Sequence, residues 1–126
     1  DGARPLVTPE LIAQTVQAAR KYRAAAPAVP VKDTIKVVEN GIVTDTPDRA
    51  TLRAVQTPQV FEADLIKGAL TNAIEKKLPL TDDCSAVEAM GFPVHLIEGS
   101  YENLKITTRE DLALAEAFLA ARGVRK

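Results

Sequence analysis

Side chains that suit phosphate binding occur in several predicted turns of this 126-residue chain. Lys105 follows a short apolar run, residues 94–97, and precedes a helix start at Thr108, so two rigid elements flank it. A fixed ammonium group can recognise a phosphate, although a solvated surface lysine fits the same pattern. The other candidates lie in separate turns or alternate along one predicted strand; they are Asp1, Arg4, Lys32, Thr34, Lys36, Arg49, Thr57, Thr81 and Asp82.

This set contains no obvious nucleophile or general base. His95 lies in an apolar strand and Cys84 within a predicted helix, positions typical of core or interface residues. A phosphate oxygen is already ionised when it attacks another phosphate, so positioning and charge stabilisation suffice for such a transfer. The pattern therefore favours group transfer to a phosphate. Structural alternatives stay open, because Arg4 could pair with Asp1 and Thr81 could serve only as a helix cap.

Composition excludes several functional classes. The chain has 16 basic and 17 acidic residues and a formal net charge of −1, which gives no electrostatic footprint for nucleic acid. No apolar run approaches the ~20 residues that span a bilayer, and no secretory signal is visible. We therefore expect neither nucleic acid nor membrane as a partner. A single cysteine and a single histidine fit a reducing compartment and make a structural zinc site unexpected.

The first half of the chain reads as a helix followed by a hairpin. The segment 8–10 supplies a capping threonine and a proline at the first helical position, so a helix is predicted to about Arg23, where the proline-containing segment 24–30 ends it. Strand residues from 31 to 38 and the Asn40-Gly41 dipeptide then predict a hairpin. A lone hairpin is marginally stable, so it packs either on a second subunit or on its own domain.

Helices dominate the second half. We predict a helix over 61–78, a short helix capped by 81–83, a strand over 94–97 and a helix over about 110–122. The predicted buried face of the first of these helices consists of Leu65, Ile66, Ala69, Leu70, Ala73 and Ile74. The alternation favours an α/β fold with a mostly parallel sheet. Because only one core strand is visible, the remaining strands are expected upstream of residue 1 or in another chain.

Short motifs occur along the chain in a characteristic order. They are Asp1-Gly2-Ala3-Arg4-Pro5, Val29-Pro30-Val31-Lys32-Asp33-Thr34-Ile35-Lys36, Asp48-Arg49, Gln56-Thr57-Pro58-Gln59-Val60-Phe61, Thr81-Asp82-Asp83 and Asn103-Leu104-Lys105-Ile106-Thr107. This set resembles the 2-C-methyl-D-erythritol 4-phosphate cytidylyltransferase family over essentially the whole chain. The match is to the C-terminal half of that enzyme. The first half, whose glycine-rich loop grips CTP, is expected upstream.

The resemblance implies a Rossmann-like nucleotidyltransferase fold with a protruding β-hairpin arm. Residues 1–126 would form the C-terminal part of a single cytidylyltransferase domain, with a dimerisation arm at about 29–56 that reaches across a homodimer. The implied reaction transfers a cytidylyl group from CTP to 2-C-methyl-D-erythritol 4-phosphate in non-mevalonate isoprenoid biosynthesis. Magnesium would be held mainly by the CTP phosphates, with no metal ligand in this chain. The implied location is the bacterial cytoplasm or the plastid stroma.

The same resemblance assigns roles to the site residues. Asp1 would touch the substrate diol or the ribose side, and Arg4 would brace that turn. Thr34 and Arg49 on the arm would bind the methylerythritol phosphate, with Arg49 as the main cation for its phosphate. The remaining positions are the substrate-site hydroxyls Thr57 and Thr81 and the lysine that steadies charge on the reacting α-phosphate, Lys105. Lys105 and Arg49 are thus the implied catalytic residues.

Two other readings remain open at this stage. Ribitol 5-phosphate cytidylyltransferase shares the Thr-Pro-Gln and Asn-x-Lys elements, although the segments 31–36 and 81–85 look more like the methylerythritol enzyme. A non-catalytic dimerisation fragment that lacks the CTP-binding half is the second alternative.

Overall fold

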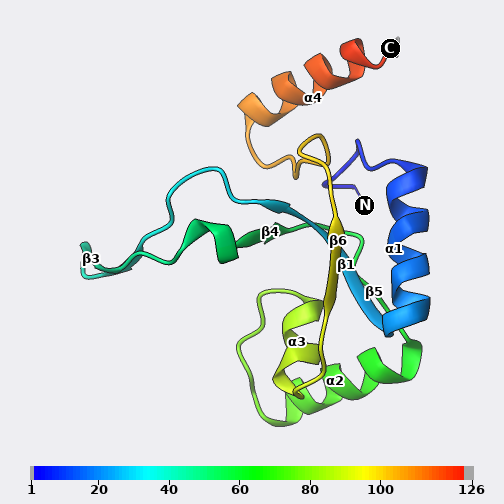
Figure 1. The fold of residues 1–126 in the computed structure, drawn as a ribbon, viewed down its shortest axis with the longest axis vertical. Coiled ribbons are helices and arrows are strands. Elements are labelled where there is room, and N and C mark those ends of the chain that lie inside the picture. Colours follow the sequence, from blue (N-terminus) through cyan, green and yellow to red (C-terminus); the bar gives the residue numbers. More distant parts are fainter. Residues whose placement is uncertain (1, 124–126) are drawn as a thin grey trace.

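A computed structural model describes residues 2–123, so the predicted site residue Asp1 lies outside the described residues. The described part is an α/β fold with one long excursion (Figure 1). Its main sheet contains β1 (Ala24–Pro30), β4 (Arg53–Val55), β5 (Val60–Phe61) and β6 (His95–Glu98). β6 pairs with β1 in parallel, whereas β4 and β5 pair with β1 antiparallel along its other edge. The described sheet is therefore mixed, which corrects the expectation of a mostly parallel sheet.

The central strand β1 was predicted as the segment that ends the first helix. All of its residues except the last are buried, and its side chains are mainly alanine. Alanine and proline give little strand signal, which explains the wrong prediction. Small side chains fit here because α1 packs against this strand and the helices α2 and α3 close over its first residue, Ala24.

The helices lie close to their predicted positions. They are α1 (Pro9–Tyr22), α2 (Ala63–Glu75), α3 (Asp83–Ala89) and α4 (Arg109–Ala121). α2 begins later than predicted because Phe61 belongs to β5, and Ile74 of its predicted buried face is 77% exposed. Leu65, Ala69 and Ala73 of that face do form the core with residues of α3. No helix within residues 2–123 combines the length and apolar character needed to cross a membrane.

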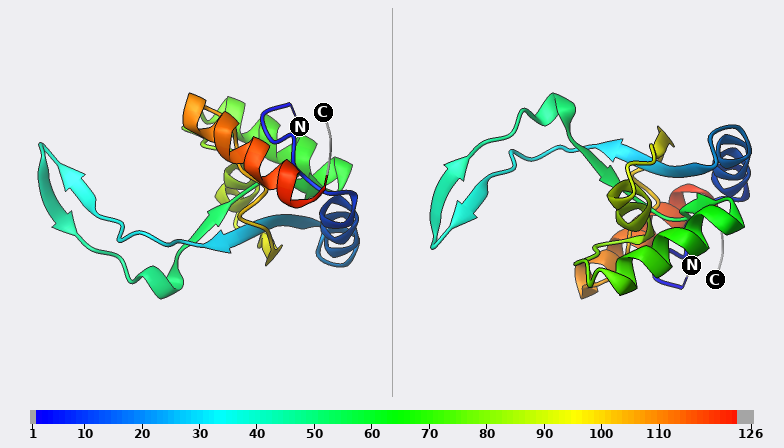
Figure 2. Two further views of the ribbon diagram at one scale, coloured as in Figure 1. Left: turned by 90° about the horizontal axis from the view of Figure 1, so that it is seen from above. Right: turned by 90° about the horizontal axis from the view of Figure 1, so that it is seen from below.

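The hairpin of β2 (Val37–Glu39) and β3 (Ile42–Asp45) projects far from the main sheet (Figures 1 and 2). Its turn is at Asn40 and Gly41, whose φ angles are 51° and 78°, as the Asn-Gly signal predicts. The predicted first strand was too long, because residues 31–36 lie outside any strand. We call residues 31–52 the arm. The arm does not lie on its own domain, which removes that alternative.

Candidate active site

Asn103 lies where three distant parts of the chain meet. Its side chain is 1% exposed, and its Nδ2 donates to the Thr57 carbonyl at 2.9 Å and to Gln56 Oε1 at 3.3 Å. Its own carbonyl accepts a hydrogen bond from Arg4 Nη1 at 2.6 Å. We call Arg4, Gln56, Thr57 and Asn103 the Asn103 cluster. Two of the predicted site residues, Arg4 and Thr57, are thus brought together beside the loop that carries Lys105.

Lys105 is exposed in the loop between β6 and α4, as predicted. The backbone on both sides of it is fixed. On one side is the buried Asn103, and on the other the Ile106 amide donates to the Ala3 carbonyl at 2.7 Å. α4 then starts with a capping box in which Thr108 Oγ1 accepts from the Asp111 amide. Hydrogen bonds from Thr107 and Thr108 to the Asp111 carboxylate lower the pKa of that group.

Arg4 is half-buried at the turn that precedes α1. Burial lowers the pKa of its guanidinium from the ordinary value, and the group remains a cation at neutral pH because arginine titrates so high. Its contact with the Asn103 carbonyl links this turn to the Lys105 loop. The alternative pairing of Arg4 with Asp1 falls on a residue outside the described part of the chain.

Thr81 lies at the start of α3, but it is not the helix cap. Asp82 caps α3 by accepting from the Ser85 amide at 2.8 Å. Because the Asp82 carboxylate already occupies this helix start, the start of α3 does not offer a site for a second anion. Gln59 connects α3 to the Thr57 loop, because its Nε2 donates to Asp82 Oδ2 at 3.0 Å and its Oε1 accepts from the Cys84 amide at 3.1 Å. Gln59 thus links the neighbours of Thr81 in α3, and not Thr81 itself, to the Thr57 loop.

The arm residues Arg49 and Thr34 are not part of that cluster. Arg49 Nη1 donates to the Lys32 carbonyl at 2.5 Å, and Thr34 is exposed on the arm. A pocket of about 480 Å³ at the arm's base falls in the size range of small-molecule sites. Its lining consists of Pro30, Val31, Asp48, Arg49, Ala50 and Arg53. Lys105 does not line it, so this single chain does not place the Arg49 and Lys105 side chains in a common pocket.

The base of the arm is nevertheless attached to the Lys105 loop through Tyr101. The Tyr101 hydroxyl donates to the Pro30 carbonyl at 2.7 Å, and Lys32 Nζ lies 3.9 Å from the centroid of the Tyr101 ring. The ring and the ammonium form a cation–π contact that holds the start of the arm. The contacts of Tyr101 therefore hold the start of the arm next to the Lys105 loop.

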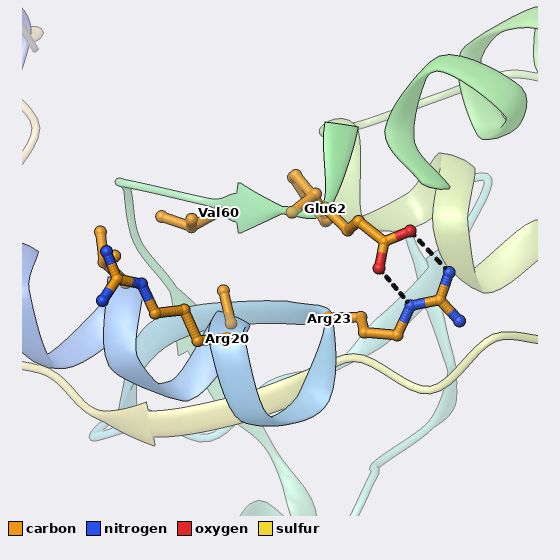
Figure 3. Close-up of a pocket in the computed structure, with 7 residues that line it drawn as sticks. Arg20, Arg23, Val60 and Glu62 are labelled. Carbon is orange, nitrogen blue, oxygen red and sulfur yellow. Dashed lines mark hydrogen bonds and ion pairs between the residues drawn. The ribbon is translucent and has the colours of Figure 1, made fainter. Parts of the chain in front are cut away.

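A separate pocket lies between α1 and β5 (Figure 3). Two arginines line it: Arg20, which is exposed, and Arg23, which donates two hydrogen bonds to Glu62 at 2.7 and 2.8 Å. The hydrogen bonds that Arg23 donates to the Glu62 carboxylate raise the pKa of Arg23 and lower the pKa of Glu62. The charge of Arg23 is therefore matched by Glu62, and none of the residues that line this pocket is a predicted site residue.

Cys84 and His95, which the sequence does not favour as nucleophiles, lie in surroundings typical of structural residues. Cys84 is 4% exposed, and burial together with the nearby acidic residues raises the pKa of its thiol to about 12. It is therefore a thiol, not the reactive thiolate, at neutral pH. The His95 ring stacks on Tyr22 with centroids 3.8 Å apart. Within residues 2–123 no group of three His, Cys, Asp or Glu side chains is arranged to hold a metal ion.

Sequence reasoning assigned no role to Asn103, Gln56 or Gly99. Asn103 and Gln56 were present in the recognised motifs, each within two residues of a predicted site residue, and that proximity was the available signal. Gly99 carried none. Its backbone amide donates to the Ala28 carbonyl at 2.8 Å, and an added Cβ would lie 2.5 Å from Gln56 Oε1. Only glycine lets the loop approach β1 and Gln56 so closely.

We expect Gly99→Ala to destabilise the complete protein by about 1–3 kcal/mol, the usual cost of overpacking. The new methyl group would press on Gln56 Oε1 and on the Ala28 backbone, which lies at 3.1–3.2 Å. The urea midpoint of unfolding measures this loss. Gly68→Ala is the matched control, because nothing lies within 4 Å of its Cβ position in α2; it should be neutral or stabilising. Equal midpoints for the two variants would contradict the close approach.

Comparison with known proteins identifies one family. The family model described as IspD, 2-C-methyl-D-erythritol 4-phosphate cytidylyltransferase, matches residues 1–121. A protein of that name from Caldanaerobacter subterraneus subsp. tengcongensis is 58% identical over 120 residues, which is 94% of this chain and 53% of the relative. The same name is given to a protein from Desulforamulus reducens that is 56% identical over 97% of this chain and 53% of its own length. The chain thus spans about half the length of the curated relatives it matches.

Solved structures give the same result. The 2-C-methyl-D-erythritol 4-phosphate cytidylyltransferase from Thermus thermophilus superposes with a TM-score of 0.83 at 41% identity, covering 94% of this chain and 58% of that one. The 4-diphosphocytidyl-2C-methyl-D-erythritol synthase from Anaerococcus prevotii gives a TM-score of 0.85 at 36% identity, over 95% of this chain and 56% of its own. These matches cover nearly the whole of this chain.

Proposed function

Because this chain belongs to the 2-C-methyl-D-erythritol 4-phosphate cytidylyltransferase family, we propose that the complete protein transfers a cytidylyl group from CTP to 2-C-methyl-D-erythritol 4-phosphate. The products are 4-diphosphocytidyl-2-C-methyl-D-erythritol and pyrophosphate, and the step serves non-mevalonate isoprenoid biosynthesis. The fold is the Rossmann-like nucleotidyltransferase fold of the solved relatives. The observation that carries the proposal is the convergence of Arg4, Thr57 and the Lys105 loop at Asn103 in a chain matched over residues 1–121.

The proposed reaction needs positioning and charge stabilisation more than proton transfer. A phosphate oxygen of the methylerythritol phosphate attacks the α-phosphorus of CTP, a new P–O bond forms, and the bond to the β-phosphate oxygen breaks to release pyrophosphate. Lys105 stabilises the negative charge that develops on the α-phosphate. Magnesium would be held mainly by the CTP phosphates and would neutralise part of their charge. Thr57 and Thr81 supply hydroxyl hydrogen bonds to the substrates, and Asp1 contacts the diol or the ribose.

The arm suggests a site shared between subunits of a homodimer. Its strands expose apolar side chains that a partner would cover, including Val38 at 56% and Ile42 at 70%. Thr34 and Arg49 lie on this arm, away from the Asn103 cluster of their own chain. We place the methylerythritol phosphate between one subunit's Lys105 region and the other subunit's arm, with Arg49 binding its phosphate. The upstream half of the protein completes the CTP site, and the enzyme acts in the cytoplasm or in a plastid stroma.

The decisive assay measures pyrophosphate release by the complete protein with CTP and Mg²⁺. Release that depends on methylerythritol phosphate supports the proposal. A higher kcat/KM with ribitol 5-phosphate would assign the protein to that substrate instead. No release with either polyol phosphate would contradict a cytidylyltransferase and favour a structural role for this half.

A further inference from the structure

Asn103 and Gln56 form a pair of buried side-chain amides next to the predicted site residues. Their exposed fractions are 1% and 6%, and Asn103 Nδ2 donates to Gln56 Oε1 at 3.3 Å. Burying an amide costs free energy unless hydrogen bonds replace those it made with water. The hydrogen bonds that this pair makes are to the backbone of neighbouring loops as well as to each other. The backbone it fixes here belongs to the loops of Thr57 and Lys105.

The surroundings of the Asn103 side chain require that it donate hydrogen bonds. Both groups that face its Nδ2 are acceptors, namely the Thr57 carbonyl at 2.9 Å and Gln56 Oε1. Asn103 Oδ1, by contrast, is buried and meets no donor among residues 2–123. A carboxylate of the same shape would therefore place negative charge against two oxygens, whereas the amide satisfies both. The chemistry of this site selects asparagine and rejects its isostere aspartate.

Gln56 also connects the Lys105 loop to the central strand β1. Its Nε2 donates to the Ser100 carbonyl at 2.8 Å, and its backbone amide donates to the Pro27 carbonyl at 2.8 Å. The beginning of the Lys105 loop is thus tied to β1 through one residue, whose side chain bonds the loop and whose backbone bonds the strand. Gly99 makes room for this contact, since its missing Cβ would overlap Gln56 Oε1.

Lys105 lies between two anchored residues. Asn103 is held by Gln56 and Thr57 on its side chain and by Arg4 on its carbonyl, and the Ile106 amide is bonded to Ala3. The lysine side chain itself is exposed, so its location depends on its backbone. Leu104 is the one residue between Asn103 and Lys105, so a shift of the Asn103 backbone would also move the backbone of Lys105.

We propose that Asn103, supported by Gln56, is a positioning residue that fixes the backbone of Lys105 relative to Thr57 during cytidylyl transfer. The inference rests on the proposed function, because it assigns Lys105 a charge that must be aimed at the reacting phosphate. A displacement of about 1 Å at such a group can reduce turnover about a hundredfold. Neither amide contacts the substrates in this proposal; both act through the loops that they join.

Asn103→Asp in the complete protein tests the proposal. We expect kcat to fall at least about tenfold, with the KM values for CTP and the polyol phosphate changed less than about threefold. In a Lys105→Ala background the same substitution should lower kcat by less than about threefold, because its effect passes through Lys105. Losses that multiply independently in the double variant would overturn the proposal. Asn72→Asp on α2 is the matched control, since that half-buried asparagine lies outside the cluster.

Hydrogen exchange measured by mass spectrometry tests the anchoring without reference to activity. Asn103→Asp should speed exchange in residues 99–106 and leave the hairpin residues 37–45 unchanged. Unchanged exchange in 99–106 would overturn the anchoring, and faster exchange with an unchanged kcat would overturn its role in the reaction. If Asn103→Asp does not fold, Gln56→Glu replaces it, because this change removes the Nε2 donor to Ser100. An inactive wild-type protein would contradict the proposed function, while the exchange experiment would still decide the anchoring.

Discussion

We expect Lys105→Ala to lower kcat by ~10²–10³ in the complete protein, the loss typical of a group that stabilises charge in the transition state. The KM for the polyol phosphate should change much less, because the role proposed for Lys105 is to meet charge that develops during the reaction. The structure supports this separation of roles, since Lys105 lies on a loop anchored on both sides. Steady-state kinetics with CTP and methylerythritol phosphate provides the measurement.

Lys67→Ala is the control for the lysine substitution, because Lys67 is an exposed lysine on α2. It removes the same charge from the protein and should leave kcat at the wild-type value. Lys105→Arg keeps a cation at the site and should retain more activity than Lys105→Ala. A kcat for Lys105→Ala equal to that of Lys67→Ala would remove Lys105 from the chemistry.

Arg49→Ala is expected to act on substrate binding. Loss of a hydrogen-bonded charge partner costs about 1.5–3 kcal/mol, which corresponds to a rise of about 10- to 100-fold in KM for the polyol phosphate. Among residues 2–123, the Arg49 side chain forms one hydrogen bond, from Nη1 to the Lys32 carbonyl, so its other N–H donors remain for a phosphate. The KM for CTP should stay near wild type. Arg20→Ala, which removes an exposed arginine of α1, serves as the control.

A mixing experiment tests whether Arg49 acts across the dimer. Arg49→Ala and Lys105→Ala subunits are combined under conditions that allow exchange. If arms are shared, each mixed dimer contains one site with both cations intact, and about a quarter of wild-type activity returns for an equal mixture. If each site is built from one chain, every site keeps a defect and no activity returns. The second result would contradict the shared site.

Local sequence signals predicted the elements with clear caps and turns. Thr8, Thr108 and the Asn40-Gly41 dipeptide each occupy the predicted capping or turn position. Such signals depend on a few neighbouring residues, so they survive in the folded protein. The loop position of Lys105 followed from them directly.

The missed features depend on tertiary packing. β1 reads as a linker because its alanines and prolines have low strand propensity, and only its burial between helices and strands makes it central. The mixed sheet was missed for the same reason, since both antiparallel pairings involve this strand. Asn103 and Gln56 could be named but not assigned roles, because their contacts join residues more than 40 positions apart.

The link from Arg4 to the carbonyl of Asn103 joins residues 99 positions apart, and the pairing of Ala3 with Ile106 runs alongside it. During translation, the turn at Arg4 leaves the ribosome long before its partners have been synthesised. Contacts between such distant residues form slowly compared with helices and hairpins. The Asn103 cluster therefore forms late in biogenesis, after α1 and the arm have already emerged, and a nascent chain stalled before Asn103 cannot form it.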